Sequence, residues 1–335
     1  MSERARTLGM GEIEKAVGAS VLAPFGRALA ELGRARPEVV GLTADLGKYT
    51  DILPFAEAFP DRFFNIGMAE QNLIAVSAGL AKTGKIPFCT TYGVFATRRA
   101  YDFIAIACAH SRANVKIVAG LPGLTTGYGG THQAIEDLAL MRMVPGLVVL
   151  DPCDATEIAQ AVVAMADYPG PVYMRLQRGD VPVVLDPAEH RFAIGEAAPL
   201  RSGRDVGIVS TGLMTPRALA AADALGKAGI SAGVLHVGTL KPFDGAALLE
   251  FASSVRAIVT AENHVVTGGL GSLVAEAMFE AGSTKPLQRI GIPDQFIECG
   301  SLPLLQSRYG LTAEAIVSAA RTSLDRASQR RVALS

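Results

Sequence analysis

Short apolar runs alternate with amphipathic stretches along almost the whole of this 335-residue sequence, and this alternation limits the folds open to it. Runs rich in Val, Ile and Leu are typical of strands that are buried on both faces of a parallel sheet. The amphipathic stretches between them are typical of helices that cover such a sheet. The sequence therefore predicts the α/β class, with parallel sheets.

A stretch rich in proline and charge interrupts the alternation at Arg178–Pro199 and marks a linker between two domains. We expect an N-terminal arm at 1–19 and a first domain over 20–185. The linker proper is placed at 186–199, and a second domain over 200–335. Two domains agree with the length of the chain, because each would be large enough for its own core.

The expected elements follow the periodicity of each domain. In the first domain we expect strands at Val39–Thr43, Phe63–Ile66, Ile86–Thr91, Val115–Ala119, Leu147–Leu150 and Val172–Leu176, with helices at Ala69–Lys82, Arg98–His110, Gln133–Met143 and Ala155–Ala166. In the second we expect strands at Val206–Thr211, Ala232–His236, Ala257–Thr260 and Leu287–Ile292, with helices at Pro216–Gly226, Gly245–Ser253, Leu270–Ala281 and Ala313–Ala327.

Charge and composition exclude several classes of function. The 31 basic and 32 acidic residues are interspersed, so the sequence offers no basic patch for nucleic acid or for a membrane surface. It contains no apolar stretch near the ~18 residues of a membrane span and no secretory signal at its start. The cysteines are widely spaced and form no metal or redox motif, which is typical of free thiols in the cytoplasm: Cys89, Cys108, Cys153 and Cys299.

Three loops that follow expected strands carry residues that could bind a ligand or take part in a reaction, because ligands collect at the carboxyl ends of parallel strands. Asn65–Asn72 brings the carboxylate of Glu70 to the start of a helix, Thr90–Phe95 carries two aromatic rings, and a glycine-rich loop from Gly120 ends at His132. Each feature alone is more often structural than functional, since acids favour first helical turns and aromatic rings favour cores. A further loop, Gly268–Gly271, lacks a dinucleotide or phosphate fingerprint, and we expect it to form a tight turn.

Taken in order, the motifs resemble the C-terminal section of the transketolase family, in the version encoded as a separate β subunit. The matching stretches are Gly67–Asn72, Phe95–Asp102, Thr131–Gln133 with Glu136-Asp137, Thr239–Asp244, Glu262–His264 with Gly268–Gly271, and Gly291–Asp294 through Tyr309–Ala315. The resemblance covers about Ser20 to Arg326. It makes the first domain a pyrimidine-binding domain and the second a transketolase C-terminal domain.

The resemblance implies thiamine diphosphate as cofactor and assigns roles to residues of the first domain. Glu70 would hydrogen-bond a ring nitrogen of the aminopyrimidine and share a proton with it, a task that requires a carboxylate of matched pKa. Tyr92 aligns with a stacking phenylalanine of the family, and Phe95 with a second wall of the pocket. Asp45 and Leu46 correspond to positions beside the cofactor's thiazolium ring.

The resemblance also implies substrate contacts. His132 corresponds to a histidine that faces the substrate and could shuttle its proton, which makes it the second expected catalytic residue. Arg175 matches an arginine that grips the acceptor's phosphate, a role suited to its planar fork of donors. Tyr128 takes the place of an aspartate that recognises a sugar hydroxyl.

Other family anion contacts are replaced: Leu22 stands for an arginine, Tyr49 for a serine and Gly120 for a histidine. We therefore expect a ketol or acyl transfer from a ketose or 2-oxo acid donor to an aldehyde-type acceptor that is not an ordinary sugar phosphate.

One part of a complete enzyme of this type is missing. The sequence contains no Gly-Asp-Gly, the motif that holds the Mg²⁺ neutralising the cofactor's diphosphate, so no metal ligand is expected in this chain. Without that metal the phosphates would carry uncompensated charge. We therefore expect a partner α chain that supplies this domain, in an α2β2 assembly whose sites lie at subunit interfaces.

Two alternatives remain open at this point. One is the β subunit of a 2-oxo acid dehydrogenase-like decarboxylase, which shares the architecture and the activating glutamate. The other is a catalytically silent subunit that scaffolds or regulates. A third class, an NAD-binding oxidoreductase, shares only the α/β rhythm, since no Gly-x-Gly-x-x-Gly follows a first strand.

Overall fold

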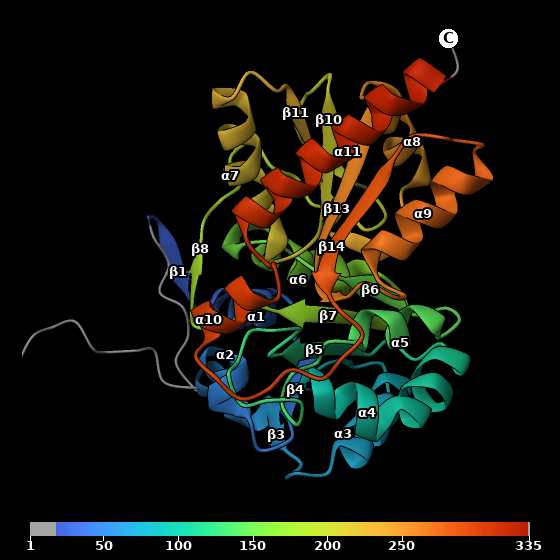
Figure 1. The fold of residues 1–335 in the computed structure, drawn as a ribbon. Coiled ribbons are helices and arrows are strands. Elements are labelled where there is room, and N and C mark those ends of the chain that lie inside the picture. The colour runs from blue at the N-terminus through green and yellow to red at the C-terminus, as the bar shows by residue number, and fades with distance from the viewer. Residues whose placement is uncertain (1–17, 334–335) are drawn as a thin grey trace, which may run out of the picture.

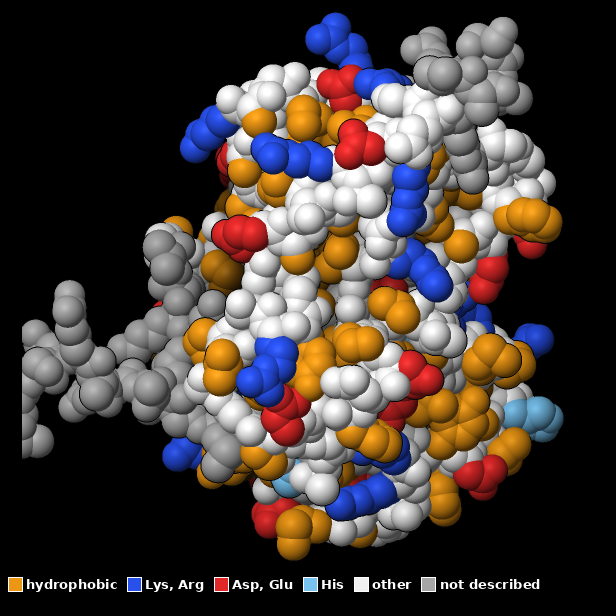
Figure 2. All heavy atoms as spheres, viewed as in Figure 1, with side chains coloured by type: hydrophobic (Ala, Val, Ile, Leu, Met, Phe, Trp, Pro, Cys, Tyr) orange, Lys and Arg blue, Asp and Glu red, His pale blue; other side chains and the backbone are white. Residues whose placement is uncertain are grey.

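The computed structural model describes residues 18–333 of the chain, which form two α/β units stacked one on the other (Figure 1). Most of the predicted arm at 1–19 lies outside the described residues. Basic and acidic side chains are interspersed over the face drawn in Figure 2. None of the helices in the described part is both long and apolar enough to cross a lipid bilayer.

The first unit is built on a seven-stranded sheet in the order β12-β6-β7-β5-β4-β2-β3. All neighbours are parallel except β12, which comes from the second half of the chain and pairs antiparallel with β6. The strands are β2 (Val39–Thr43), β3 (Phe63–Asn65), β4 (Ile86–Tyr92), β5 (Lys116–Gly120), β6 (Val148–Leu150), β7 (Val172–Leu176) and β12 (Thr239–Lys241).

Helices cover both faces of this sheet and so bury its apolar strands. One face packs against α3 (Glu70–Lys82), α4 (Gly93–Phe103), the π-helical segment η4 (Ile104–His110) and α5 (Asp137–Met143). The other packs against α1 (Pro24–Ala35), α2 (Leu53–Ala58) and α6 (Ala155–Asp167). Short 3₁₀ turns, η2 (Gly47–Thr50) and η3 (Pro60–Arg62), flank α2.

The second unit contains a five-stranded sheet in the order β14-β13-β10-β11-β9, in which only β9 is antiparallel. Its strands are β9 (Ala198–Arg201), β10 (Val206–Ser210), β11 (Ala232–His236), β13 (Ala257–Val265) and β14 (Leu287–Ile292). Its helices are α7 (Met214–Lys227), α8 (Gly245–Ser253), α9 (Leu270–Glu280), α10 (Leu302–Arg308) and α11 (Ala313–Ala333). Two short strands, β1 (Ser20–Leu22) and β8 (Asp180–Pro182), pair antiparallel beside the first unit.

The predicted α/β class with two parallel-dominated sheets is confirmed. Several elements differ from prediction: α1, α2 and β12 were not expected, and α4 starts at Gly93 rather than Arg98. The helix expected from Gln133 starts only at Asp137. Residues just before α5 form a bridge between Ala134 and Pro122 instead, and Gln133 donates to the Thr126 carbonyl at 2.9 Å.

A buried ion pair joins the two units at the start of α6. His236, the last residue of β11, lies 2.7 Å through its Nε2 from the Glu157 carboxylate, and both side chains are almost fully buried. Burial alone would lower the pKa of His236, but the carboxylate outweighs it and raises that pKa above its usual value. Burial alone would raise the pKa of Glu157, but His236 and His190 hold it well below its usual range.

We expect His236→Gln to lower the free energy of unfolding most at mildly acidic pH. The raised pKa of His236 means that its contribution is fully present below its unfolded pKa of about 6.5 and is lost as pH rises through the folded pKa. Because the pKa of Glu157 is lowered, its carboxylate stays ionised and the ion pair with His236 persists down to below about pH 4.3. Urea unfolding from pH 5 to 9 should therefore show a difference in the free energy of unfolding between wild type and variant, and this difference should become smaller as pH rises. The exposed His110→Gln is the control, and a difference independent of pH would contradict this account.

Candidate active site

The residues predicted to bind the cofactor lie beyond the carboxyl ends of β2 and β4. Asp45 and Leu46 follow β2, and Tyr92 ends β4, with Phe95 in the first turn of α4. Because β2 and β4 are neighbouring parallel strands, their carboxyl ends meet at one edge of the sheet. The geometry of the sheet thus brings these four residues together from separate stretches of sequence.

Glu70 is the first residue of α3, where the helix dipole favours a negative charge, and only 3% of it is exposed. Its Oε1 accepts a hydrogen bond from Nη1 of Arg99 on α4 at 3.0 Å, and Arg99 is half exposed. A buried carboxylate is therefore held in place by a cation that itself reaches solvent. Arg99 was not predicted from sequence as a site residue, although it lies one helical turn after Phe95.

Aromatic rings continue the site from Glu70 toward the third loop. The Arg99 guanidinium lies 4.0 Å from the centre of the Phe95 ring, and the Phe95 and Tyr92 rings are 5.7 Å apart. The His132 ring is 5.4 Å from Phe95, 6.2 Å from Tyr92 and 5.4 Å from Tyr128, edge-on to all three. These contacts connect Glu70, Phe95, Tyr92, His132 and Tyr128 in one chain of neighbours, with Arg99 between Glu70 and Phe95.

Leu46 packs against the Tyr92 and Phe95 cluster, and Asp45 lies beside it in an exposed position with a left-handed backbone (φ 58°). Asn65, at the end of β3, fixes this turn. Its Oδ1 accepts from the N–H groups of Asp45 and Gly67, each at 3.0 Å, and its Nδ2 donates to Asp45 Oδ1 at 3.0 Å. Asn65 therefore ties the loop after β2 to the loop that leads into Glu70.

His132 is held at its backbone and at one ring nitrogen. Its N–H donates to the Gly129 carbonyl at 2.9 Å, and Nδ1 lies 2.9 Å from the hydroxyl of Thr131. Nε2 has no hydrogen-bond partner among the described residues. The ring is thus oriented with one nitrogen free for a ligand.

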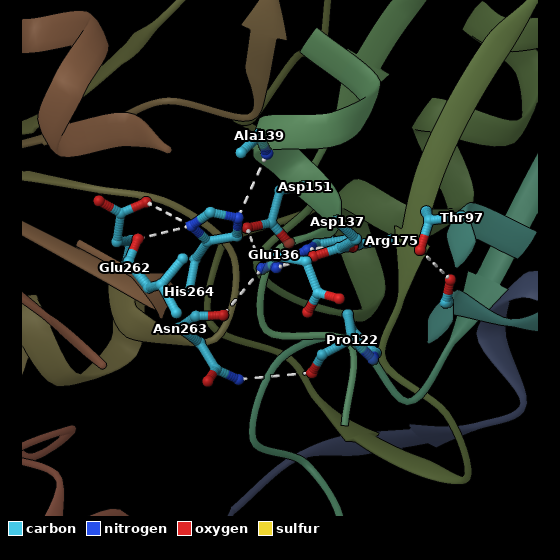
Figure 3. A network of polar contacts seen from close by, with 12 residues as sticks. Thr97, Pro122, Glu136, Asp137, Ala139, Asp151, Arg175, Glu262, Asn263 and His264 are labelled. Atoms are coloured by element: carbon cyan, nitrogen blue, oxygen red, sulfur yellow. Dashed lines mark hydrogen bonds and ion pairs between the residues drawn. The ribbon is translucent and has the colours of Figure 1, made fainter. Parts of the chain in front are cut away.

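Arg175 was predicted to grip a phosphate, and the structure contradicts that prediction. It lies within β7, is 2% exposed, and donates through Nε to Asp137 at 2.9 Å and through Nη1 to the Asn263 carbonyl at 3.2 Å. A weaker contact reaches Asp151 at 3.4 Å. Figure 3 shows this network, in which the guanidinium faces the two aspartates and the chain of the second unit. Its donors are committed, so Arg175 joins the two units instead of binding substrate.

Arg178, three residues further on, lies in the loop that follows β7. Its Nε is buried without a hydrogen-bond partner among the described residues. Burial raises the pKa of Tyr92 and the pKa of Asp51. The positive charge of Arg178 opposes both rises. The phenols of Tyr128 and Tyr49 also raise the pKa of Tyr92. Sequence analysis missed Arg178, although its position just after β7, at the ligand-binding edge of the sheet, was a usable signal.

The substituted positions lie near this edge. Tyr49, in η2, has 46% of its side chain exposed, and its backbone lies against Gly120 at the end of β5. Gly120 is enclosed by Tyr49, Thr50 and Tyr92, since a Cβ there would meet all three within 3.6 Å. Leu22, in β1, is exposed.

The loop Gly268–Gly271 is filled by protein rather than open to a ligand. The Glu262 carboxylate accepts from the N–H groups of Leu270 and Gly271 at 2.7 and 2.8 Å, which are the donors a phosphate would use at a helix start. Burial raises the pKa of Glu262 to about 7. A Cβ at Gly269 would lie 1.9 Å from that carboxylate, so glycine is required by close packing.

Comparison with known proteins agrees with this arrangement. Residues 19–183 match the transketolase pyrimidine binding domain, and residues 195–316 match the transketolase C-terminal domain. The chain belongs to the transketolase family. Glu70, Tyr92, Phe95 and His132 all lie within the part that matches the pyrimidine binding domain.

Individual relatives cover nearly the whole chain. An uncharacterized transketolase family protein of Sinorhizobium fredii is 54% identical over 90% of this chain and 88% of its own length. A 6-deoxy-6-sulfo-D-fructose transketolase subunit of a Clostridium species is 42% identical over 90% of this chain and 94% of its own. A solved split-gene transketolase, described as an inactive β4 tetramer, superposes with a TM-score of 0.85 at 45% identity and covers 92% of this chain and 99% of its own.

Proposed function

We propose that this chain is the β subunit of a two-chain, thiamine-diphosphate-dependent transketolase, and that it transfers a two-carbon ketol or related acyl unit to an aldehyde-type acceptor. The observation that carries the proposal is the buried carboxylate of Glu70, which Arg99 joins to the rings of Phe95 and Tyr92 at the ligand-binding edge of the sheet. Membership of the transketolase family supports it.

The residues present fit the aminopyrimidine end of the cofactor. A flat, weakly basic ring needs an aromatic wall and one acid of matched pKa, and Phe95, Tyr92 and Glu70 offer these on one surface. When bound, thiamine diphosphate supplies the chemistry for breaking and forming the carbon–carbon bond. With the cofactor bound, Glu70 would hold a proton and share it with a ring nitrogen, and Leu46 and Asp45 would lie toward the thiazolium.

The remaining groups act on the substrate. His132, with Nδ1 held by Thr131 and Nε2 free, can donate to a substrate oxygen or take up its proton. Tyr128 presents an exposed phenol beside it, which can hydrogen-bond a hydroxyl of the acceptor.

The diphosphate end of the cofactor requires a partner chain. No Gly-Asp-Gly occurs in the sequence, so we assign Mg²⁺ and the diphosphate to an N-terminal, α-type subunit in an α2β2 assembly. Two relatives point the same way by name, since one is called a subunit and the other a split-gene transketolase.

The acceptor is proposed to differ from an ordinary sugar phosphate. Arg178 is the guanidinium next to the site without a partner for its Nε in the described part of the chain, while Leu22, Tyr49 and Gly120 offer no charge. The absence of charged side chains at these three positions suits a singly charged or neutral acceptor better than a doubly charged phosphate. The Clostridium relative, named for a sulfonated sugar, supports a substrate of this class.

The test is reconstitution with a candidate partner subunit that contains Gly-Asp-Gly. Co-purification followed by assay with thiamine diphosphate, Mg²⁺, hydroxypyruvate and a panel of aldehydes should give ketol transfer that neither chain gives alone. Activity with pyruvate and a lipoyl carrier would instead identify a 2-oxo acid dehydrogenase-like β subunit. Strong preference for pentose phosphates would overturn the acceptor proposal while leaving the reaction class intact.

A catalytically silent subunit is the second candidate, and one observation favours it. The solved relative is described as an inactive tetramer of β chains. Inactivity of β chains alone is also what a shared active site requires, so the two candidates separate only in the assembled complex. There, a silent subunit would tolerate loss of the Glu70 carboxylate.

Arg178→Ala is expected to raise the KM of anionic acceptors about 10- to 100-fold, because hydrogen bonds to a charged group contribute roughly 1.5–3 kcal/mol. The kcat and the KM of neutral acceptors such as glycolaldehyde should change little. Steady-state kinetics with a charged and a neutral acceptor measure both effects. The exposed Arg27→Ala serves as control, and an equal loss for both acceptors would show that Arg178 does not contact the anion.

A further inference from the structure

A segment of the second unit, 293–300, reaches across to the loop of the first unit that carries Tyr128 and His132. The segment follows β14 and precedes α10. The Gly300 N–H donates to the Gly127 carbonyl at 3.1 Å, and the Cys299 thiol donates to the Tyr128 carbonyl at 3.3 Å. Two successive backbone carbonyls of the loop are thus held from the other unit.

The segment lies in close contact with the glycines of the loop, although the side chains of Cys299 and Phe296 are also exposed to solvent. A Cβ at Gly129 would lie 2.8 Å from the Cys299 sulfur, closer than real Cβ atoms come to a heavy atom, and Gly129 also has a left-handed backbone (φ +80°). A Cβ at Gly130 would lie 3.3 Å from the Phe296 ring. The position of the loop therefore depends on the side chains of Cys299 and Phe296.

Both the loop and the segment are fixed on their other sides. Arg98 of α4 donates to the Gly130 carbonyl at 2.7 Å and forms an ion pair with Glu136, so the far end of the loop is anchored to the first unit. The segment is anchored to the second unit by Glu298, which contacts Arg308 and Tyr309. A change at Cys299 would therefore be transmitted to the loop rather than absorbed by the segment.

We propose that Cys299 and Phe296 are positioning residues of the active site, which set the Tyr128–His132 loop for the acceptor. The inference rests on the proposed function, because it assumes that His132 and Tyr128 meet substrate. It gives the C-terminal domain a part in acceptor selection. Glu70 and Phe95, which are proposed to contact the cofactor, form no hydrogen bond, ion pair or ring contact with the segment in the described part of the chain, so activation of the cofactor should not depend on it.

The test compares Cys299→Leu with Cys299→Ser in the reconstituted complex. Leucine adds bulk where the contact with Gly129 is already closest, so kcat/KM for the acceptor should fall roughly 10- to 100-fold, the cost of displacing a positioned group by about 1 Å. Serine is close in size and can donate to the same carbonyl, so it should restore most of the activity. Exchange of the proton on the thiazolium C2 carbon should stay within twofold of wild type in both variants.

A second pair of variants guards against misfolding. Phe296 and Phe279 are both exposed phenylalanines of the second unit, and only Phe296 contacts the loop. Phe296→Ala should raise the acceptor KM several-fold, and Phe279→Ala should not. Unchanged acceptor kinetics in Cys299→Leu and Phe296→Ala, or a loss of proton exchange equal to the loss of turnover, would overturn the inference. Absence of thiamine-dependent exchange in the wild-type complex would instead overturn the proposed function.

Discussion

Replacing Glu70 with glutamine is expected to lower turnover of the assembled enzyme about 10²- to 10⁴-fold, the usual contribution of a general acid–base group. Glutamine keeps the size of the side chain but cannot share a proton with the pyrimidine ring. The same substitution should slow hydrogen–deuterium exchange at the thiazolium C2 carbon, which NMR follows directly. Unlike Cys299→Leu, it should affect exchange and turnover together.

The substitution should leave folding and assembly intact. Within residues 18–333 the Glu70 carboxylate pairs only with Arg99, which is half exposed, and such partly solvated ion pairs contribute little to stability. Glu57→Gln, at an exposed position of α2, is the matched control and should behave as wild type. Full activity of the Glu70 variant in a complex that binds the cofactor would favour the catalytically silent subunit.

Arg175→Met is expected to lower the free energy of unfolding by about 3–5 kcal/mol, because it leaves two buried carboxylates without their cation. Burial alone would raise the pKa of Asp137, and Arg175 holds that pKa below its usual value. Without the guanidinium, Asp137 and Asp151 would have to take up protons or admit water. Urea unfolding at pH 7 measures the loss.

Arg201→Met provides the comparison, because Arg201 pairs with Asp223 at an exposed position where the expected loss is only about 0–1 kcal/mol. A similar loss in both variants would contradict the structural role assigned to Arg175. A stable Arg175 variant with a raised KM for anionic acceptors would restore the prediction made from sequence.

Much of the fold could be read from the sequence because the strands are apolar on both faces. Strands β2, β7, β11 and β14 have the predicted bounds, and the first three are buried along their whole length. β12 could not be predicted, because a three-residue strand is defined by its partner β6, nearly ninety positions earlier, rather than by its own pattern.

In the candidate site, too, some features could be predicted from the sequence and others could not. Glu70, Tyr92, Phe95 and His132 were expected near one another from motifs placed at strand ends, and the structure brings them together. Arg175 was misjudged because it lies inside a buried strand, where an arginine must be paired, and the sequence does not show that its partners are Asp137 and Asp151. The arginine beyond the strand end, Arg178, is the one left with an unpaired donor.

The pairing of β12 with β6 has a consequence for how this chain can be divided. An uncovered edge strand offers its main-chain groups to other chains, and β12 covers β6 so that only a three-residue strand is left at that end of the first sheet. A fragment cut at the linker would lose this cover and expose β6 to self-association. We therefore expect the two described units to stay folded and free of self-association only when they remain on one polypeptide.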